Sequence, residues 1–263
     1  MAKWDELNES TPLHGGIFFT LSAAYALLTA VSLIQFIRIQ SRSRTFEWST
    51  QMVFVLMNIF VNAVRAAVFG FHIFVVLKSK VLTSVLLDLP GLFFFSTYTL
   101  LVLFWSEIYY QAINETTDTL KAWYISVNSV IYVIQVLIWI SLGLYDTSFV
   151  GSVNQVFIAV SSVIAASGFL LFGGRLCLML MRFPIESKGR KKKIYEVRSV
   201  TAICIVSFLI RCITAAKSAF NADASLRVLD QPTAFDLVYY MLVEILPCAL
   251  VLFILRKLPA KRE

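Results

Sequence analysis

The sequence predicts an all-α membrane protein, a bundle of seven transmembrane helices with a receptor-like topology. Of its 263 residues, 59% are hydrophobic and 15% are charged. Soluble domains have about 45–50% apolar and about 25% charged residues. The apolar residues also gather in seven long runs, each of about the 20 residues that cross a hydrocarbon core. Runs of this length and uniformity indicate helices, because lipid offers no partner for backbone polar groups and barrel strands are shorter and alternate in polarity.

The seven runs are joined by short connections. They cover residues 16–37, 52–77, 90–110, 123–144, 153–181, 197–220 and 234–255. No connection is long enough for a soluble domain with its own core, so we expect residues 1–263 to form a single seven-helix membrane domain. The first fifteen residues show no basic segment and no cleavage site, and we expect the first helix itself to direct membrane insertion.

Local signals support individual runs. Asp88 followed by Pro90 predicts a helix start at the lumenal end of the third run, with Asp88 as an N-cap rather than a buried acid. Trp123 opens the fourth run, where an aromatic ring suits the headgroup layer. Small residues in the fifth run predict close contacts between helices; they are Ala165, Gly168, Gly173 and Gly174.

The loop charges predict the orientation, because Lys and Arg are retained on the cytosolic side. One set of connections holds fourteen cations: Arg38, Arg42, Arg44, Lys121, Arg182, Lys188, Arg190, Lys191, Lys192, Lys193, Arg256, Lys257, Lys261 and Arg262. The other set holds five: Lys3, Lys78, Lys80, Lys217 and Arg227. We therefore expect a lumenal N-terminus and a cytosolic C-terminus.

Polar residues inside the runs form the candidate intramembrane site. A charge at the centre of a membrane helix costs about 2.5–3.5 kcal/mol on insertion scales and is usually paired or functional. In the second run, residues with helical spacing share one face that should point into the bundle: Asn58, Asn62, Arg65 and His72. Arg211 in the sixth run and Glu244 in the seventh lie at a similar depth. Three interpretations stay open: an ion-pair network that holds helices together, a ligand-binding pocket or switch, and an ion or proton pathway.

A basic segment follows the fifth run on the predicted cytosolic side. Its cations are Arg182, Lys188, Arg190, Lys191, Lys192 and Lys193. Such clusters attract anionic lipids at about 1 kcal/mol per cation. The segment is interpreted either as a topogenic and lipid-contact element or as a docking site for a cytosolic protein. Direct nucleic-acid binding is not expected, because no aromatic residues are interleaved for base stacking.

The residue counts argue against an enzyme. The two histidines, His14 and His72, cannot supply a His-Glu-x-x-His zinc site or a many-histidine metal centre. The sequence has no glycine-rich phosphate loop and no Gly-x-Ser-x-Gly motif. The seventh run has no lysine that could form a retinal Schiff base. We predict that the protein is not an enzyme and needs neither a metal nor a cofactor.

Several stretches resemble the plant tobamovirus multiplication protein family. They are TQMVFVLMN (50–58), NAVR (62–65), GFH (70–72), LLDLPG (86–91), FWSEIY (104–109), RFPIESKGR (182–190), SVTAIC (199–204) and LRKLP (255–259). The resemblance spans nearly the whole chain. The family pattern usually runs further at both ends, so we expect this chain to be a shortened or variant form.

The resemblance implies a seven-helix protein of the plant vacuolar membrane, or tonoplast. It implies a scaffold that tobamoviruses use as a host factor and that anchors the viral replication protein through its helicase region. It also implies an Arf-like small GTPase as a partner. The family offers no catalytic residues. The alternative hypothesis is a receptor-like protein or transporter that binds a small ligand or lipid among Arg65, His72, Arg211 and Glu244.

Overall fold

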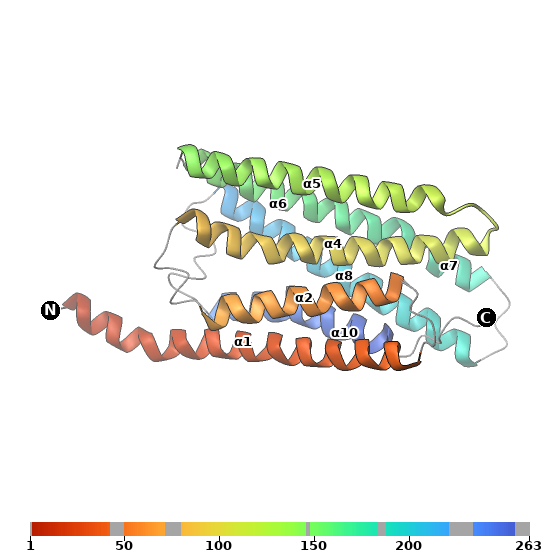
Figure 1. Cartoon of the computed structure of the whole chain (residues 1–263), viewed down its shortest axis with the longest axis horizontal. Helices are drawn as coiled ribbons and strands as arrows, with labels where there is room; N and C mark the ends of the chain where they lie inside the picture. Colours follow the sequence, from red (N-terminus) through yellow and green to blue (C-terminus); the bar gives the residue numbers. More distant parts are fainter. Residues whose placement is uncertain are drawn as a thin grey trace.

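The fold is a bundle of long helices, seen in a computed structural model of the chain (Figure 1). The structure describes residues 2–42, 50–71, 80–145, 148–182, 188–220 and 234–255. Within these ranges the elements are α1 (Ala2–Arg42), α2 (Thr50–Gly70), α4 (Lys80–Ala112), α5 (Asp118–Tyr145), α6 (Ser148–Gly168), η1 (Phe169–Gly173), α7 (Gly174–Arg182), α8 (Lys188–Phe220), α9 (Ala234–Tyr240), η3 (Met241–Ile245) and α10 (Leu246–Leu255).

The described residues contain seven helices that are long and apolar enough to cross a membrane, which confirms the predicted helix class. The candidate spans are Gly15–Ser41, Met52–Gly70, Val85–Ala112, Thr119–Tyr145, Phe149–Met181, Ile194–Phe220 and Ala234–Ile254. Two spans are composite, because short π-helical segments join α6 to α7 and α9 to α10. The second run was expected to reach residue 77, and its last six residues lie outside the described ranges.

The helices lie roughly parallel to one another, and neighbours in the chain often pack side by side. Contacts join α1 to α2, α2 to α4, α4 to α5 and α6 to α8. The start of α1 lies at one end of the bundle, and the tip of α7, the start of α8 and the end of α10 lie at the other (Figure 1). The described parts of the segments predicted to be cytosolic therefore share one end. The side of the membrane that this end faces remains a prediction.

Aromatic contacts tie the helices together in two buried clusters. In the first, Tyr98 of α4 and Phe169 of η1 pack on Phe208 of α8, with ring centroids 5.4 Å apart for Tyr98 and 6.0 Å apart for Phe169. In the second, Phe69 of α2 contacts Tyr25 of α1 at 5.8 Å and Tyr240 of α9 at 5.2 Å. Such pairs contribute about 0.5–1.5 kcal/mol beyond the area that they bury.

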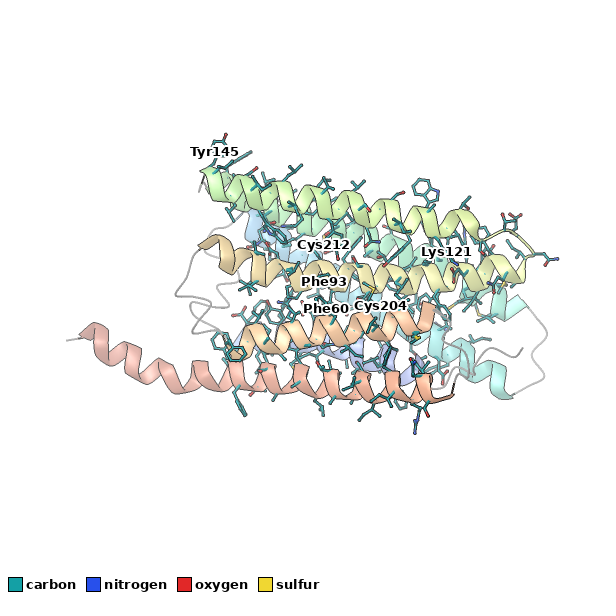
Figure 2. All side chains as sticks on the ribbon, viewed as in Figure 1. Phe60, Phe93, Lys121, Tyr145, Cys204 and Cys212 are labelled. Atoms are coloured by element: carbon teal, nitrogen blue, oxygen red, sulfur yellow. The ribbon has the colours of Figure 1, made fainter. Side chains whose placement is uncertain are left out.

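Large apolar side chains project outward from several helices, as a lipid-facing surface requires. Examples are Leu27 of α1, Leu137 of α5 and Leu170 of η1, each more than half exposed. Phe93 of α4 is partly buried and meets the more exposed Phe60 of α2 edge-to-face, with ring centroids 4.9 Å apart (Figure 2). Lys121 and Tyr145 mark the two ends of α5 in the same view.

Gly173 lies where η1 passes close to α8. A Cβ atom there would lie 2.7 Å from Oγ1 and 2.8 Å from Cγ2 of Thr201, and 3.0 Å from the Trp105 ring. Small residues in this span are predicted to make close contacts between helices, and Gly173 makes one. The adjacent Gly174 has no atom within 4 Å of a Cβ position.

These neighbouring glycines give a matched test of packing. Gly173→Ala should lower the free energy of unfolding by about 1–3 kcal/mol, because the added methyl group forces the α8 contact apart. Gly174→Ala should be neutral or slightly stabilising, since alanine has the better helix propensity. Thermal unfolding of both variants in detergent would check this. Equal midpoints would contradict the close contact between η1 and α8.

Candidate functional site

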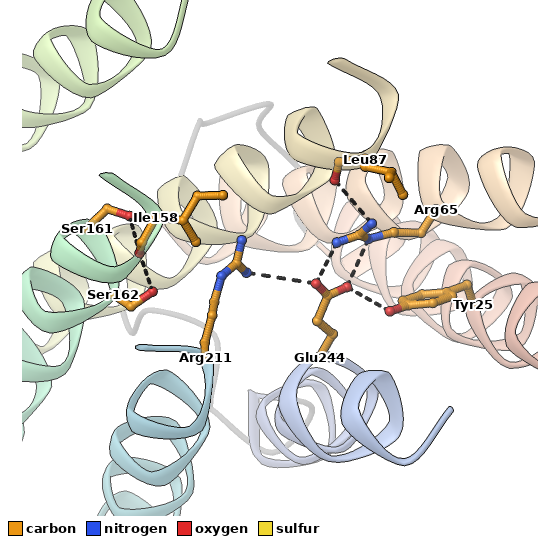
Figure 3. A network of polar contacts seen from close by, with 8 residues as sticks. All are labelled: Tyr25, Arg65, Leu87, Ile158, Ser161, Ser162, Arg211 and Glu244. Atoms are coloured by element: carbon orange, nitrogen blue, oxygen red, sulfur yellow. Dashed lines mark hydrogen bonds and ion pairs between the residues drawn. The ribbon is translucent and has the colours of Figure 1, made fainter. Parts of the chain in front are cut away.

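The Glu244 carboxylate is the centre of a buried polar cluster. Glu244 lies in η3, and its side chain is 2% exposed. Arg65 of α2 binds it with two hydrogen bonds, donated by Nη2 to Oε1 at 2.6 Å and by Nε to Oε2 at 2.9 Å. The Tyr25 hydroxyl of α1 donates to Oε2 at 2.7 Å (Figure 3). This two-pronged geometry is the strongest form of an arginine–carboxylate pair.

The remaining faces of the Arg65 guanidinium also have partners. Nη1 donates to the backbone carbonyl of Leu87 in α4 at 3.3 Å. The Tyr240 ring lies 5.0 Å from the guanidinium carbon and the Phe69 ring lies 5.9 Å from it, within the range of cation–π attraction. Arg65 thus contacts the helical segments that carry Glu244, Leu87 and Tyr240, and it is as buried as Glu244.

Arg211 of α8 approaches the same carboxylate less closely. Its Nη1 lies 3.8 Å from Glu244 Oε1, which is an ion pair but too long for a hydrogen bond. Its side chain is 15% exposed, against 3% for Arg65. A Cβ atom on Gly91 of α4 would collide with Arg211 Nη2. Glycine at position 91 therefore leaves the space that the guanidinium occupies.

The π-helical turn η3 has a local cause in the sequence. Pro247 has no backbone N–H, and in an α-helix its ring would clash with the carbonyl four residues earlier. The Leu246 N–H bonds to the Met241 carbonyl five residues back, as in a π-helix. The widened turn accommodates the proline and sets the direction of Glu244. Such bulges often occur at functional sites.

A second polar contact continues the α2 face toward α10. The Cys248 thiol donates to Asn58 Oδ1 at 2.9 Å, and Asn62 Nδ2 contacts Cys248 Sγ at 3.4 Å. Three of the residues that the sequence placed on one face, Asn58, Asn62 and Arg65, therefore contact the last span. His72 lies outside the described residues.

The expectation for Asp88 was wrong. Asp88 is not an N-cap, because α4 begins earlier, at Lys80, and runs through Asp88 and Pro90. Its Oδ2 accepts hydrogen bonds from Trp139 Nε1 at 3.2 Å and from Asn154 Nδ2 at 3.0 Å. Asn154 also accepts from Gln135 at 2.8 Å. Asp88 thus joins α4 to α5 and α6 as a partly buried acid.

Sequence reasoning missed this second cluster. Gln135 and Asn154 lie inside otherwise apolar runs, where an amide side chain needs a hydrogen-bond partner. Their position is the feature of the sequence that could have indicated this cluster. A lone amide costs less than a charge in the membrane and stands out less. The pairing of the two amides with each other and with Asp88 required the structure.

The basic segment lies apart from these clusters. Arg182 is the last residue of α7, and α8 already begins at Lys188, before the predicted start at residue 197. The backbones of Lys188, Arg190, Lys191, Lys192 and Lys193 are therefore helical. Their side chains lie outside the described part of the structure.

Two small cavities border Arg211. One, of about 10 Å³, lies among α4, α8 and the last span, and the other, of about 20 Å³, lies among α4, α5, α6 and α8. Pockets for small organic ligands measure about 300–1,000 Å³. The cluster around Glu244 is thus a packed network, and these two cavities have space only for something the size of water. In the described residues no group of three or more His, Cys, Asp or Glu side chains could hold a metal ion.

With this geometry established, comparison with known proteins gives the family. Residues 1–263 match the THH1/TOM1/TOM3 domain. The chain belongs to this family. It is 61% identical to tobamovirus multiplication protein 1 of Arabidopsis thaliana over 98% of the chain and 89% of that protein. The corresponding protein of Nicotiana tabacum is also 61% identical, over 98% of the chain and 90% of its own length.

The relationship extends to a second type of relative. Tobamovirus multiplication protein 3 of Nicotiana tabacum is 50% identical over 98% of the chain and 88% of that protein. These relatives are named for virus multiplication and not for an enzymatic reaction. No solved structure matches the chain. The resemblance recognised in the sequence is therefore confirmed at the level of the family.

Removing the central carboxylate tests the cluster. Glu244→Gln should lower the free energy of unfolding by about 3–5 kcal/mol, because the buried Arg65 and the partly buried Arg211 lose their counter-charge. Arg65→Met should cost less, since Glu244 keeps Arg211 and the Tyr25 hydroxyl. Tyr25→Phe should cost only about 0.6 kcal/mol, the average for a hydrogen bond within a membrane protein. Denaturation in detergent would measure all three.

The order of the three effects is the decisive result. A Glu244→Gln protein as stable as the wild type would contradict a central role for the carboxylate. A larger loss for Arg65→Met than for Glu244→Gln would move the centre of the network to the arginine.

Proposed function

We propose that this protein is a membrane-embedded host factor that supports the multiplication of tobamoviruses in plants. The 61% identity to tobamovirus multiplication protein 1 over 98% of the chain is the observation that carries the proposal. Seven apolar helices suit a protein that holds its partners at a membrane. No chemical reaction is part of this role.

The proposed mechanism is recruitment. The protein would anchor the tobamovirus replication protein, through its helicase region, and an Arf-like small GTPase at the vacuolar membrane. In this way it would support viral RNA replication without binding the RNA directly. The network around Glu244 favours a scaffold over the receptor or transporter hypothesis, because the cavities beside Arg211 are too small for an organic ligand.

The basic start of α8 is the proposed docking site. Five of the six residues from Lys188 to Lys193 are cationic, and their backbone is already helical. A helix that continues from the bundle presents its charges with less conformational freedom than a loop. An acidic surface on a cytosolic partner would have the opposite charge to this segment. Anionic membrane lipids are a second set of contacts for the same residues.

A recruitment assay tests the basic start of α8 as the docking site. Replacing Lys188, Arg190, Lys191, Lys192 and Lys193 by Ala should abolish capture of a tobamoviral helicase fragment and reduce capture of Arf-like GTPases from detergent-solubilised membranes. A matched variant with Lys188, Lys191, Lys192 and Lys193 changed to Arg keeps the charge. It should retain most of the capture, and added salt should weaken binding by screening the charges.

The assay is interpreted together with a topology measurement, because loop cations also orient the helices. Loss of capture in the alanine variant with unchanged topology supports the docking site. Unchanged capture would place the docking surface on another exposed segment. Failure of the wild-type protein to capture the helicase fragment would contradict recruitment itself.

Localisation gives an independent test. A fluorescent fusion of the intact chain should label the vacuolar membrane of plant cells, and its C-terminus should be accessible to protease from the cytosol. Labelling of another membrane would contradict the proposed site of recruitment. A protected C-terminus would contradict the proposed orientation.

A further inference from the structure

The larger cavity beside Arg211 is lined by an unusual set of polar groups for the interior of a membrane bundle. It measures about 20 Å³, and its polar lining comes from four helices: Asp88 of α4, Gln135 of α5, Ser161 and Ser162 of α6, and Arg211 of α8. Apolar rings close it, among them Phe95 and Phe208. A cavity needs about 10–15 Å³ to hold one water molecule.

Gln135 brings an acceptor to this cavity. The side chain is only 1% exposed. Its Nε2 donates to Asn154 Oδ1 at 2.8 Å, whereas its Oε1 has no hydrogen-bond partner among the residues that the structure describes. A buried carbonyl oxygen without a donor is unfavourable, because it has lost its hydrogen bonds to water and gained none in return. Gln135 Oε1 is therefore available to accept a hydrogen bond from a group inside the cavity.

Arg211 supplies hydrogen-bond donors to the same cavity. A guanidinium has five N–H groups. Within the described part of the chain, Arg211 makes the 3.8 Å ion pair with Glu244 and no hydrogen bond. In Figure 3 it stands between Glu244 on one side and Ser161 and Ser162 on the other. The N–H groups of Arg211 are therefore available to donate hydrogen bonds to an acceptor inside the cavity.

The other polar groups that line the cavity limit which kind of molecule or ion could bind in it. The Ser161 and Ser162 hydroxyls both donate to the Ile158 carbonyl, at 2.9 and 2.7 Å, and so can only accept from the cavity. An anion could accept from Arg211 but could not donate to Gln135. A metal cation could bind the oxygens but would lie beside the positive guanidinium. A water molecule both accepts and donates.

We propose that this cavity binds one ordered water molecule that accepts a hydrogen bond from Arg211 and donates one to Gln135 Oε1. The water would join the two polar clusters of the bundle. One cluster surrounds Glu244 and connects α1, α2 and the last span, and the other surrounds Asp88 and connects α4, α5 and α6. Through this water Arg211, which pairs with Glu244 in the first cluster, would be linked to Gln135, which bonds to Asn154 in the second. This inference does not depend on the proposed function.

Hydroxyl-radical labelling by X-ray pulses tests the proposal on the wild-type protein in detergent. Radicals formed from a bound water attack the side chains next to it. Phe95 lines the cavity and is 4% exposed, whereas Phe54 of α2 is 3% exposed and lines neither cavity beside Arg211. Phe95 should be labelled and Phe54 should not. Absence of label on Phe95 under conditions that label exposed rings would overturn the proposal.

Two further experiments, a Gln135 variant and a change of salt, test whether the cavity binds a water molecule through Gln135. Gln135→Met keeps the side-chain length and removes the amide oxygen, so labelling of Phe95 should be lost. Ser141→Ala, a polar change elsewhere on α5, should leave it intact. Labelling that survives in a folded Gln135→Met protein would overturn the role of Gln135. Labelling that disappears when choline chloride is replaced by sodium chloride would identify a cation and overturn the assignment to water.

Discussion

The contact between Glu244 and its two arginines is the constraint on which the bundle depends. Lipid gives little hydrophobic drive for helices to associate, so polar contacts and close packing must specify how they pack. Arg65 and Glu244 are 179 residues apart in the chain, and their hydrogen bonds bring α2 and the last span together. Tyr25 adds α1 and Arg211 adds α8. One carboxylate thus fixes the relative positions of four spans.

The sequence predicts the helices and part of this cluster because both rest on simple regularities. Run length identifies the spans, and helical spacing puts Asn58, Asn62 and Arg65 on one face. The π-helical turn is not predicted, because Pro247 can also produce a kink. Asp88 is misplaced because Asp before Pro signals a helix start wherever it occurs. The first turns of α8 are missed because the lysine run has no apolar period.

The molecule divides its polar residues between two tasks. Several of those in the bundle bond to one another, as the pairs of Arg65 with Glu244 and of Asp88 with Asn154 illustrate. They leave little room for an organic ligand beside Arg211. The basic residues from Lys188 onward belong to the end of the bundle that also holds the end of α10 (Figure 1). A rigid interior and a charged end suit a protein whose proposed role is to hold partners at a membrane.

The turn that carries Glu244 has a consequence for how this cluster could arise. A π turn contains one residue more than the α-helical turn that it replaces, and one residue corresponds to about 100° of rotation. The bulge absorbs this offset, so α9 and α10 can each keep their packed faces. A single inserted codon in an uninterrupted helix would therefore suffice to turn an acid from one neighbour to another. A relative whose last span is an uninterrupted α-helix would therefore align with this span across a gap of one residue.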